Sequence, residues 1–324
     1  MTVTAGAELA DRVRAGEALA CARLMSLAER GDARFPEQYG RFHAELGRAR
    51  RFGITGPPGA GKSTLVERLA LHWRAAGHTL GIVAVDPTSP FSGGALLGDR
   101  VRMSRLALDA GVFIRSMATR GLFGGLARAS DDVVDVLDLY GRDTILIETV
   151  GVGQSEVDIA RSADLTVVVL HPGGGDTIQA MKAGLMEVAD VYLVNKADMP
   201  GLDRLVAQLT DILDLRDIPH ELRPPILTSV AATGQGVAAL AAELDRMHAE
   251  RAASGVLAAR RAANLEKRVR RLVDGRLRQD IWETFGLAGT LARRLSQPGP
   301  HSAWGLAGEI LDIYRNARPS ESDA

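Results

Sequence analysis

The sequence of 324 residues predicts an α/β fold, in which a mostly parallel sheet is flanked by helices, with helical extensions at both ends. Between residues 49 and 245, short apolar runs alternate with amphipathic stretches. Runs that are apolar on both faces and are separated by helices are typical of buried parallel strands. On either side, residues 8–30 and 246–284 have the apolar spacing of helices.

Seven apolar runs are the predicted strands of a βαβ series. They are Phe52–Thr55, Gly81–Val85, Val112–Ile114, Thr144–Ile147, Leu165–Leu170, Val191–Val194 and Ile226–Leu227. We expect their carboxyl ends to form one edge of the sheet, which is where ligands bind in open α/β folds.

The flanking segments divide the chain into three expected parts. Residues 1–48 form a helical extension, with one helix over residues 8–30 that is interrupted near Gly16 and a second over residues 36–48. Residues 49–245 contain the sheet, and residues 246–324 form a helical arm whose last helix covers residues 303–317.

Composition points to a globular chain that acts in a reducing compartment. Hydrophobic residues make up 46% and charged residues 24%, and the formal net charge is −1. A charge near zero gives no general attraction to nucleic acid or to an anionic membrane. Cys21 is the single cysteine, so no internal disulfide forms. We see no signal peptide and no run of about 18 apolar residues, and we therefore expect a cytoplasmic protein.

A glycine-rich segment after the first strand has the pattern G-x-x-x-x-G-K-[ST]. It reads Gly56-Pro57-Pro58-Gly59-Ala60-Gly61-Lys62-Ser63, and Thr64 begins the helical stretch that follows. Strand, loop and helix in this order form the P-loop, whose backbone N–H groups and helix N-terminus hold nucleotide phosphates. Lys62 is expected to reach the β- and γ-phosphates, and Ser63 to bind Mg²⁺.

A second motif follows the sixth strand and predicts the base. Asn195, Lys196 and Asp198 belong to an N-K-x-D pattern. A carboxylate accepts two hydrogen bonds from guanine, from N1–H and from the exocyclic amine, which adenine cannot supply. The next strand is followed by Val230, Ala231 and Ala232, where many GTPases carry a Ser-Ala-x segment. We expect the backbone contact with the base to remain, and the serine hydroxyl that stabilises this loop to be lost.

Acidic residues at the same edge are the predicted metal ligands. Asp86 ends the second strand, Glu148 ends the fourth, and Asp99 lies in the loop between the second and third. Carboxylates beside a serine and phosphates suit Mg²⁺, directly or through water. The alternative for each residue is a role in helix capping or a turn.

Three loops at this edge are candidate switches that order around a γ-phosphate. They cover residues 86–100, 149–156 and 173–182. For the third loop, the alternative is a helix N-terminus capped by Asp176. No general base is evident, and Gln154 lies far from the expected γ-phosphate position.

Several of these segments together resemble the MeaB/ArgK family of GTPases. The resemblance rests on the Asp-Pro-Thr-Ser segment at residues 86–89, Gly-Asp-Arg-Val-Arg-Met at 98–103, Glu-Thr-Val-Gly-Val-Gly-Gln-Ser-Glu at 148–156, and the N-K-x-D pattern. It covers nearly the whole chain, and the segment at 148–156 is the most distinctive part, because Ras-like GTPases have Asp-x-x-Gly there.

The resemblance implies a specific function. Members chaperone adenosylcobalamin-dependent acyl-CoA mutases, such as methylmalonyl-CoA mutase: they gate cobalamin delivery, and they protect or reactivate the mutase. They hydrolyse GTP slowly alone and faster with the mutase. The residues carried over as catalytic are Lys62, Asp99, Glu148 and Lys182, the last as a possible stabiliser of transition-state charge in a third switch that also holds Asp176. GTP or GDP and Mg²⁺ are the implied cofactors.

The resemblance also implies a homodimer formed through the C-terminal arm. Leu265, Val269 and Leu272 lie three or four positions apart, and Ile281 follows nine positions later, all among many arginines. This pattern predicts a helix with one apolar seam. This seam packs either on a second subunit or on its own domain. Nucleic-acid binding is disfavoured, because acidic residues balance the arginines and no aromatic residues interleave.

Three rival functions share parts of the pattern. A nickel or zinc metallochaperone GTPase needs metal ligands, and the sequence has no C-x-x-C or histidine cluster; each lone histidine is expected to lie on the surface or fill the core. A kinase acting on an amino-acid transport system needs a channel for a protein substrate, and nothing in the sequence marks such a channel. A scaffold that binds GTP without hydrolysis would not need Lys62, Ser63 and Glu148.

Overall fold

The computed structural model describes residues 7–86, 106–118, 125–149, 162–173, 185–216, 219 and 222–317. Asp99, Gln154, Asp176 and Lys182, and most of the three candidate switch loops, lie outside these ranges. The chain packs as two compact units, Met1–Asn264 and Leu265–Ala324. This division reflects how the chain packs and does not test the predicted division into residues 1–48, 49–245 and 246–324, which stays a prediction.

The first unit is built on a seven-stranded sheet with the order β3-β2-β4-β1-β5-β6-β7, in which every neighbouring pair is parallel. The strands are β1 (Arg50–Thr55), β2 (Leu80–Asp86), β3 (Val112–Ala118), β4 (Thr144–Thr149), β5 (Leu165–Leu170), β6 (Val191–Val194) and β7 (Ile226–Thr228). All seven predicted runs are strands, which confirms the predicted fold class.

Strand β3 extends furthest beyond its predicted limits. β3 continues four residues past Ile114 and includes Arg115, a charged residue that breaks the apolar run. Helix α2 supplies the partners, because Arg115 donates hydrogen bonds to Glu29 at 2.6 and 2.7 Å and to Ser26 at 3.1 Å. A tertiary contact therefore satisfies a charge that the strand pattern by itself disfavours.

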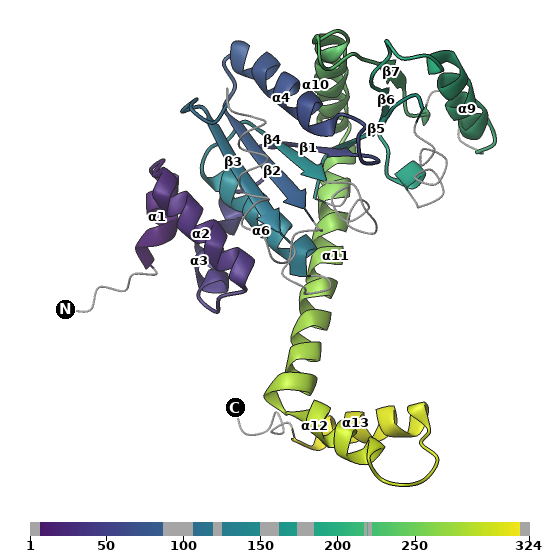
Figure 1. The fold of residues 1–324 in the computed structure, drawn as a ribbon. Helices are drawn as coiled ribbons and strands as arrows, with labels where there is room; N and C mark the ends of the chain where they lie inside the picture. The colour runs from purple at the N-terminus through teal and green to yellow at the C-terminus, as the bar shows by residue number, and fades with distance from the viewer. Residues whose placement is uncertain are drawn as a thin grey trace. The chain divides into compact units, whose positions relative to one another are not determined.

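Helices cover both faces of the sheet (Figure 1). α4 (Lys62–Ala75) and α10 (Val237–Ala253) share one apolar cluster with β1, β5 and β6. α6 (Gly125–Leu139) packs in a second cluster with β2 and β4, and α9 (Leu202–Asp214) packs in a third with β5 and β6. Because side chains alternate along a strand, neighbouring residues of β5 enter different clusters.

The N-terminal helices belong to the same apolar core as α6. They are α1 (Ala7–Arg14), α2 (Ala18–Arg30) and α3 (Phe35–Phe42), followed by the 3₁₀ turn η1 (His43–Glu45). The predicted interruption near Gly16 is confirmed, since Gly16 has φ +84° between α1 and α2. Gly31, with φ +62°, ends α2. Its backbone N–H donates to the carbonyl oxygen of Ala28, and the N–H of Asp32 donates to that of Leu27, as expected of a left-handed C-terminal glycine.

The second unit is helical. α11 (Val256–Gln279) runs from the first unit into the second, where it is followed by the π-helical turn η4 (Asp280–Thr284), α12 (Leu287–Leu295) and α13 (Ala303–Ala317). The cluster holding η4, α12 and α13 together centres on the buried side chains of Leu287, Ile310 and Tyr314. Among the described helices, none is long and apolar enough to cross a membrane.

Candidate functional site

The loop between β1 and α4 requires two of its glycines. Gly56 has φ +139°, and a Cβ there would lie 2.0 Å from the carbonyl oxygen of Val169 on β5. Gly61 has φ +87°, and its Cβ would lie 2.4 Å from Nδ2 of Asn195. Only glycine fits both the backbone conformation and the close approach. The P-loop pattern therefore reflects contacts with β5 and with the residue that follows β6.

Lys62 is held across this loop. Its side chain is buried, and Nζ donates hydrogen bonds to the carbonyl oxygens of Gly56, at 2.6 Å, and Pro57, at 3.0 Å. As the first residue of α4, Lys62 also stands at the positive end of a helix dipole. The loop thus combines a lysine ammonium with a helix N-terminus, which suits phosphate binding.

Ser63 and Glu148 meet at the edge of the sheet. The Ser63 hydroxyl donates a hydrogen bond of 2.6 Å to Oε1 of Glu148, whose side chain is buried at the end of β4. Asp86 ends the adjacent strand β2; its side chain lies outside the described part of the chain, as does Asp99. A hydroxyl and a carboxylate side by side are oxygen ligands of the type that Mg²⁺ prefers, so the described residues fit such an ion.

Asn195 connects the phosphate loop with the predicted base loop. Its Nδ2 donates to the carbonyl oxygen of Ala60 at 2.8 Å, and its Oδ1 accepts from the Ser229 hydroxyl and from the backbone N–H of Ala231, both at 3.0 Å. The side chain is buried. The side-chain amide of Asn195 thus donates to the phosphate loop and accepts from the predicted base loop, which fixes the distance between the two loops. Such a fixed distance suits a ligand that contacts both loops.

A left-handed turn follows Asn195 and leads to Asp198. Lys196 has φ +55°, the only described non-glycine residue with a positive φ. Backbone hydrogen bonds hold this left-handed turn, from Met199 to Lys196 at 2.9 Å and from Ala197 to Ser229 at 3.0 Å. Strain of this kind clusters at ligand sites. Asp198 is exposed at the sheet edge.

Ser229 corrects one expectation. We expected the base loop to lose a stabilising hydroxyl because Val230 occupies the usual serine position. The hydroxyl comes instead from Ser229, one residue earlier, whose side chain is buried against Asn195. The spacing of residues in the sequence did not predict that Ser229 would provide this hydroxyl. Ala232 is also anchored, since its carbonyl oxygen accepts a 2.6 Å hydrogen bond from Arg68 on α4.

His171 is a second residue that motif analysis missed, since it was assigned to the surface or the core. It directly follows β5, and its ring lies over Gly59 of the phosphate loop, with Nε2 3.8 Å from the position of a Cβ on that glycine. Burial lowers the pKa of the imidazole, and the charges of Lys196 and Lys62 lower it further. The ring is therefore neutral near pH 7.

These residues define the chain as a P-loop nucleotide-binding protein. The comparisons place it more narrowly. A family model described as methylmalonyl Co-A mutase-associated GTPase MeaB matches residues 21–285. The chain therefore belongs to this family of GTPases, which confirms the resemblance seen in its motifs and the prediction of a GTPase that binds guanine nucleotide.

Two relatives agree with this assignment, and one solved structure supports the fold. A candidate GTPase of Pyrococcus horikoshii is 47% identical over 271 residues, which cover 83% of this chain and 86% of the relative. The mitochondrial homologue of the methylmalonic aciduria type A protein from Mus musculus is 40% identical over 215 residues, or 65% of this chain and 52% of the relative. A solved structure titled LAO/AO transport system kinase aligns with a TM-score of 0.73, covers 97% of this chain and 99% of its own, and is 24% identical, which supports the fold.

Proposed function

We propose that this chain is a GTP-hydrolysing chaperone for an adenosylcobalamin-dependent acyl-CoA mutase, methylmalonyl-CoA mutase or a close relative. In this role it gates cofactor delivery and protects or reactivates the mutase. The observation that carries the proposal is the match over residues 21–285 to a family described as associated with that mutase. The intact contacts of Lys62, Ser63 and Asn195 support nucleotide-dependent activity.

The described residues suggest how hydrolysis is prepared. Backbone N–H groups between Gly56 and Lys62 hold the phosphates, and the Lys62 ammonium neutralises charge on the β- and γ-phosphates. Asp198 reads guanine, while Asn195 keeps the base loop at a fixed distance from the phosphate loop. Phosphoryl transfer depends mostly on such positioning and charge stabilisation. We infer that mutase binding completes the site through the loops at 86–100, 149–156 and 173–182, with Lys182 adding positive charge.

We further propose that Mg²⁺ binds beside Ser63 and Glu148, with Asp86 and Asp99 as additional direct or water-bridged ligands. The 2.6 Å contact between Ser63 and Glu148 supports this, because it brings two suitable oxygens together. A bound Mg²⁺ would supply charge stabilisation for the phosphates. The measurement is the affinity for GDP with and without Mg²⁺, in the wild type and in Ser63→Ala; equal affinities in all four cases contradict the metal site.

GTP hydrolysis by the purified protein tests the main proposal. Phosphate release is measured under single-turnover conditions, alone and with each of methylmalonyl-, isobutyryl-, ethylmalonyl- and hydroxyisobutyryl-CoA mutase. A faster release of phosphate with one mutase supports the chaperone function and identifies the partner, provided that the substitution Lys62→Ala abolishes this increase. Equal rates with and without every mutase contradict partner activation.

The rival functions give different results in the same preparation. A kinase for an amino-acid transport system would transfer the labelled γ-phosphate to a protein hydroxyl rather than to water. A metallochaperone would bind nickel or zinc tightly and would respond to GTP by releasing it. A scaffold would bind GTP and release no phosphate.

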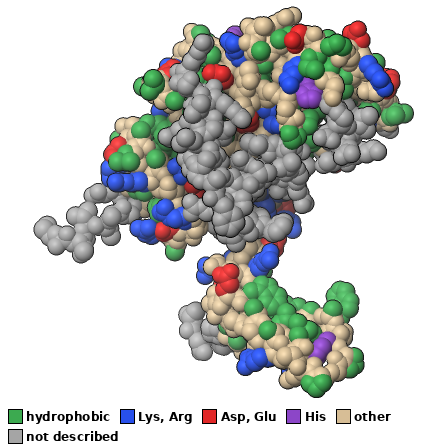
Figure 2. Space-filling model, in the orientation of Figure 1, with side chains coloured by type: hydrophobic (Ala, Val, Ile, Leu, Met, Phe, Trp, Pro, Cys, Tyr) green, Lys and Arg blue, Asp and Glu red, His purple; other side chains and the backbone are tan. Residues whose placement is uncertain are grey.

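We also propose a homodimer through the C-terminal arm. Three residues of the predicted seam are exposed in the single chain, Leu265 (57%), Val269 (49%) and Leu272 (41%), together with the neighbouring Val273 (51%). Ile281, the fourth residue of that seam, packs instead against the apolar cluster of the second unit. The spacing of the exposed residues puts them on one stripe of the helix. Figure 2 shows hydrophobic side chains gathered on the second unit, where Trp304 is 90% exposed. Contiguous exposed apolar surface is typical of interfaces.

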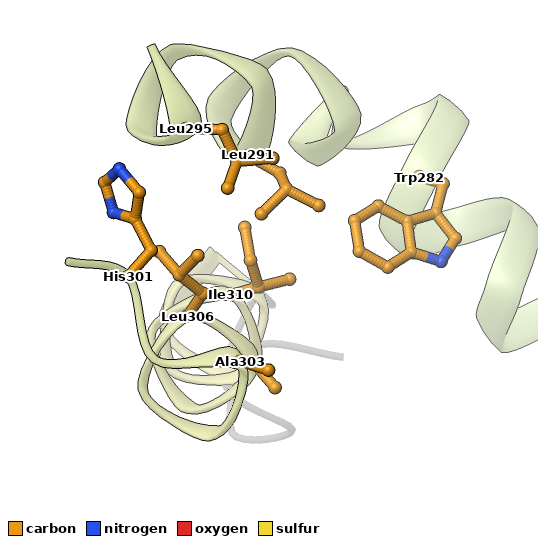
Figure 3. A pocket seen from close by; sticks show the side chains of 8 residues that line it. Trp282, Leu291, Leu295, His301, Ala303, Leu306 and Ile310 are labelled. Carbon is orange, nitrogen blue, oxygen red and sulfur yellow. The ribbon is translucent and has the colours of Figure 1, made fainter. Parts of the chain in front are cut away.

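A groove in the second unit adds to this surface (Figure 3). It has a volume of about 340 Å³, and its lining includes Trp282, Leu291, Leu295 and Leu306. Sedimentation of Val269→Glu tests the dimer, with Arg276→Glu as a control that introduces the same side chain at a position 75% exposed. A Val269→Glu protein that sediments as the wild type does contradicts an interface through this stripe.

The final part of the proposal concerns location. We propose that the protein acts in the cytoplasm without binding nucleic acid or a membrane, which its formal net charge of −1 supports. Fractionation of the native host tests this, and recovery of the protein with membranes or with nucleic acid contradicts it.

A further inference from the structure

His171 belongs to none of the nucleotide-binding motifs, yet it lies between two of them. It follows β5, which pairs with β1 on one side and β6 on the other. β1 leads into the phosphate loop, and β6 leads to Asn195, whose backbone N–H donates to the carbonyl oxygen of Leu170 at 2.8 Å. The end of β5 therefore brings this histidine to the centre of the nucleotide edge.

The ring is directed at the phosphate loop. Nε2 lies 3.8 Å from the position of a Cβ on Gly59, a glycine with φ +74° in the middle of the loop. The backbone after the ring is confined, because Pro172 is buried and Gly173 turns with φ +83°. A Cβ at Gly59 would thus be in ordinary van der Waals contact with the imidazole, and the direction of the ring is set by the fold.

Charge and burial determine the state of this ring. Burial, Lys196 and Lys62 hold its pKa below the ordinary value, so it carries one proton near pH 7. Nδ1 is buried and has no hydrogen-bond partner among the described residues. A proton on Nδ1 would be a buried donor without an acceptor, so the proton belongs on Nε2, the nitrogen that faces the loop.

We propose that His171 is an additional nucleotide-binding residue, whose neutral Nε2–H donates a hydrogen bond to a β-phosphate oxygen beside Gly59. The inference rests on the proposed guanine-nucleotide site and adds a fourth element to it, after the P-loop, the N-K-x-D turn and the base loop. We assign the β-phosphate as the acceptor because Nε2 faces Gly59, and the backbone of the P-loop holds the α- and β-phosphates.

A neutral donor suits this place. Lys62 and Lys196 already supply positive charge, and a third cation between them would be repelled whenever the phosphates leave. A neutral N–H to a charged oxygen still forms a strong hydrogen bond. His171 therefore adds affinity for the diphosphate without requiring proton uptake when the nucleotide binds.

The test compares two substitutions with a matched control. His171→Leu removes the donor, and His171→Gln keeps a neutral side-chain N–H. His72→Leu makes the same change at an exposed histidine of α4. Kd is measured for GDP, for a non-hydrolysable GTP analogue and for GMP. We expect His171→Leu to weaken GDP and the GTP analogue equally, by about 10-fold, as loss of a hydrogen bond to a charged group does.

The expected pattern distinguishes a hydrogen bond to the β-phosphate from a general effect of His171 on packing. GMP, which lacks the β-phosphate, should lose much less affinity, His171→Gln should retain most of the affinity for GDP, and His72→Leu should match the wild type. The ratio of the wild-type to the His171→Leu affinity should stay constant from pH 7 to pH 8.5, since a neutral donor does not titrate there. Unchanged circular dichroism spectra show that all variants are folded.

Three results would overturn the inference. They are equal GDP affinity in the wild type and His171→Leu, an equal loss for GMP and GDP, and a ratio that collapses as the pH rises, which would assign the contact to an imidazolium. Failure of the proposed function looks different, because the wild-type protein itself would then not bind GDP or hydrolyse GTP.

Discussion

Replacing Arg261 with methionine is expected to destabilise the first unit, because this arginine neutralises a buried carboxylate. The Arg261 guanidinium donates from Nε to Oδ1 and from Nη2 to Oδ2 of Asp164, both at 2.7 Å. It also donates to the carbonyl oxygens of Gly47, at 2.6 Å, and Ala49, at 2.9 Å. Asp164 stands immediately before β5, so one side chain of α11 holds the start of a central strand.

The magnitude follows from burial and from the carboxylate pKa. Removing one partner of a buried ion pair lowers the free energy of unfolding by about 3–5 kcal/mol. Here the Arg261 side chain is 29% exposed, and Asp164 keeps a 3.0 Å hydrogen bond from the Arg51 backbone, which reduces the cost. Burial raises the pKa of Asp164, but the hydrogen bonds from Arg261 outweigh it, and the pKa is about 2 instead of 3.8. A shift of that size corresponds to about 2–3 kcal/mol.

The same linkage predicts the pH dependence. The pKa of Asp164 is lower in the folded protein than in the unfolded chain, so its contribution is fully present above about pH 4. It is lost as the pH falls from about 4 through about 2, because below both pKa values the carboxyl group is protonated in the folded and in the unfolded state. The difference between wild type and Arg261→Met should therefore be largest near pH 7 and should shrink as the pH falls toward 2.

Urea unfolding followed by circular dichroism measures this difference. Arg246→Met is the control. That arginine is 54% exposed and pairs with Glu243 and Glu250 of the same helix, so its loss should change the stability far less than the loss of Arg261. If Arg261→Met unfolds within about 0.5 kcal/mol of the wild type at pH 7, or if the difference persists unchanged at pH 2, the linkage argument is wrong.

Three further predictions address the site and the core. Gly61→Ala places a Cβ 2.4 Å from Nδ2 of Asn195 at φ +87°, and should weaken GDP binding more than about 10-fold; an unchanged Kd would contradict the steric argument. Asp198→Asn should shift preference from GDP to xanthosine diphosphate, because an amide N–H can donate to the carbonyl that replaces guanine's amine; competition binding that still favours GDP would speak against Asp198 as the base reader. Burial raises the pKa of the Cys21 thiol to about 12. The folded protein should therefore not react with an aromatic disulfide reagent at pH 8, whereas the protein unfolded in urea should react. Immediate reaction of the folded protein would refute this prediction.

Local sequence was sufficient wherever the signal lay within one segment. The seven strands were predicted because parallel strands are apolar on both faces, and their limits differ from the predictions mostly by one or two residues. The P-loop and the N-K-x-D turn were predicted because backbone conformation and chemistry fix residue types at short spacing. Gly56 and Gly61 illustrate this, since each has a positive φ.

Only the tertiary structure decided which distant residues meet. Ser229 takes over a hydroxyl contact expected one residue later, because the turn directs it at Asn195. His171 reaches the phosphate loop because β5 lies next to β1. Arg261 binds Asp164, 97 residues earlier. Motifs and periodicity record the local backbone and the faces of elements, whereas these contacts depend on strand order and helix placement, which no local pattern encodes.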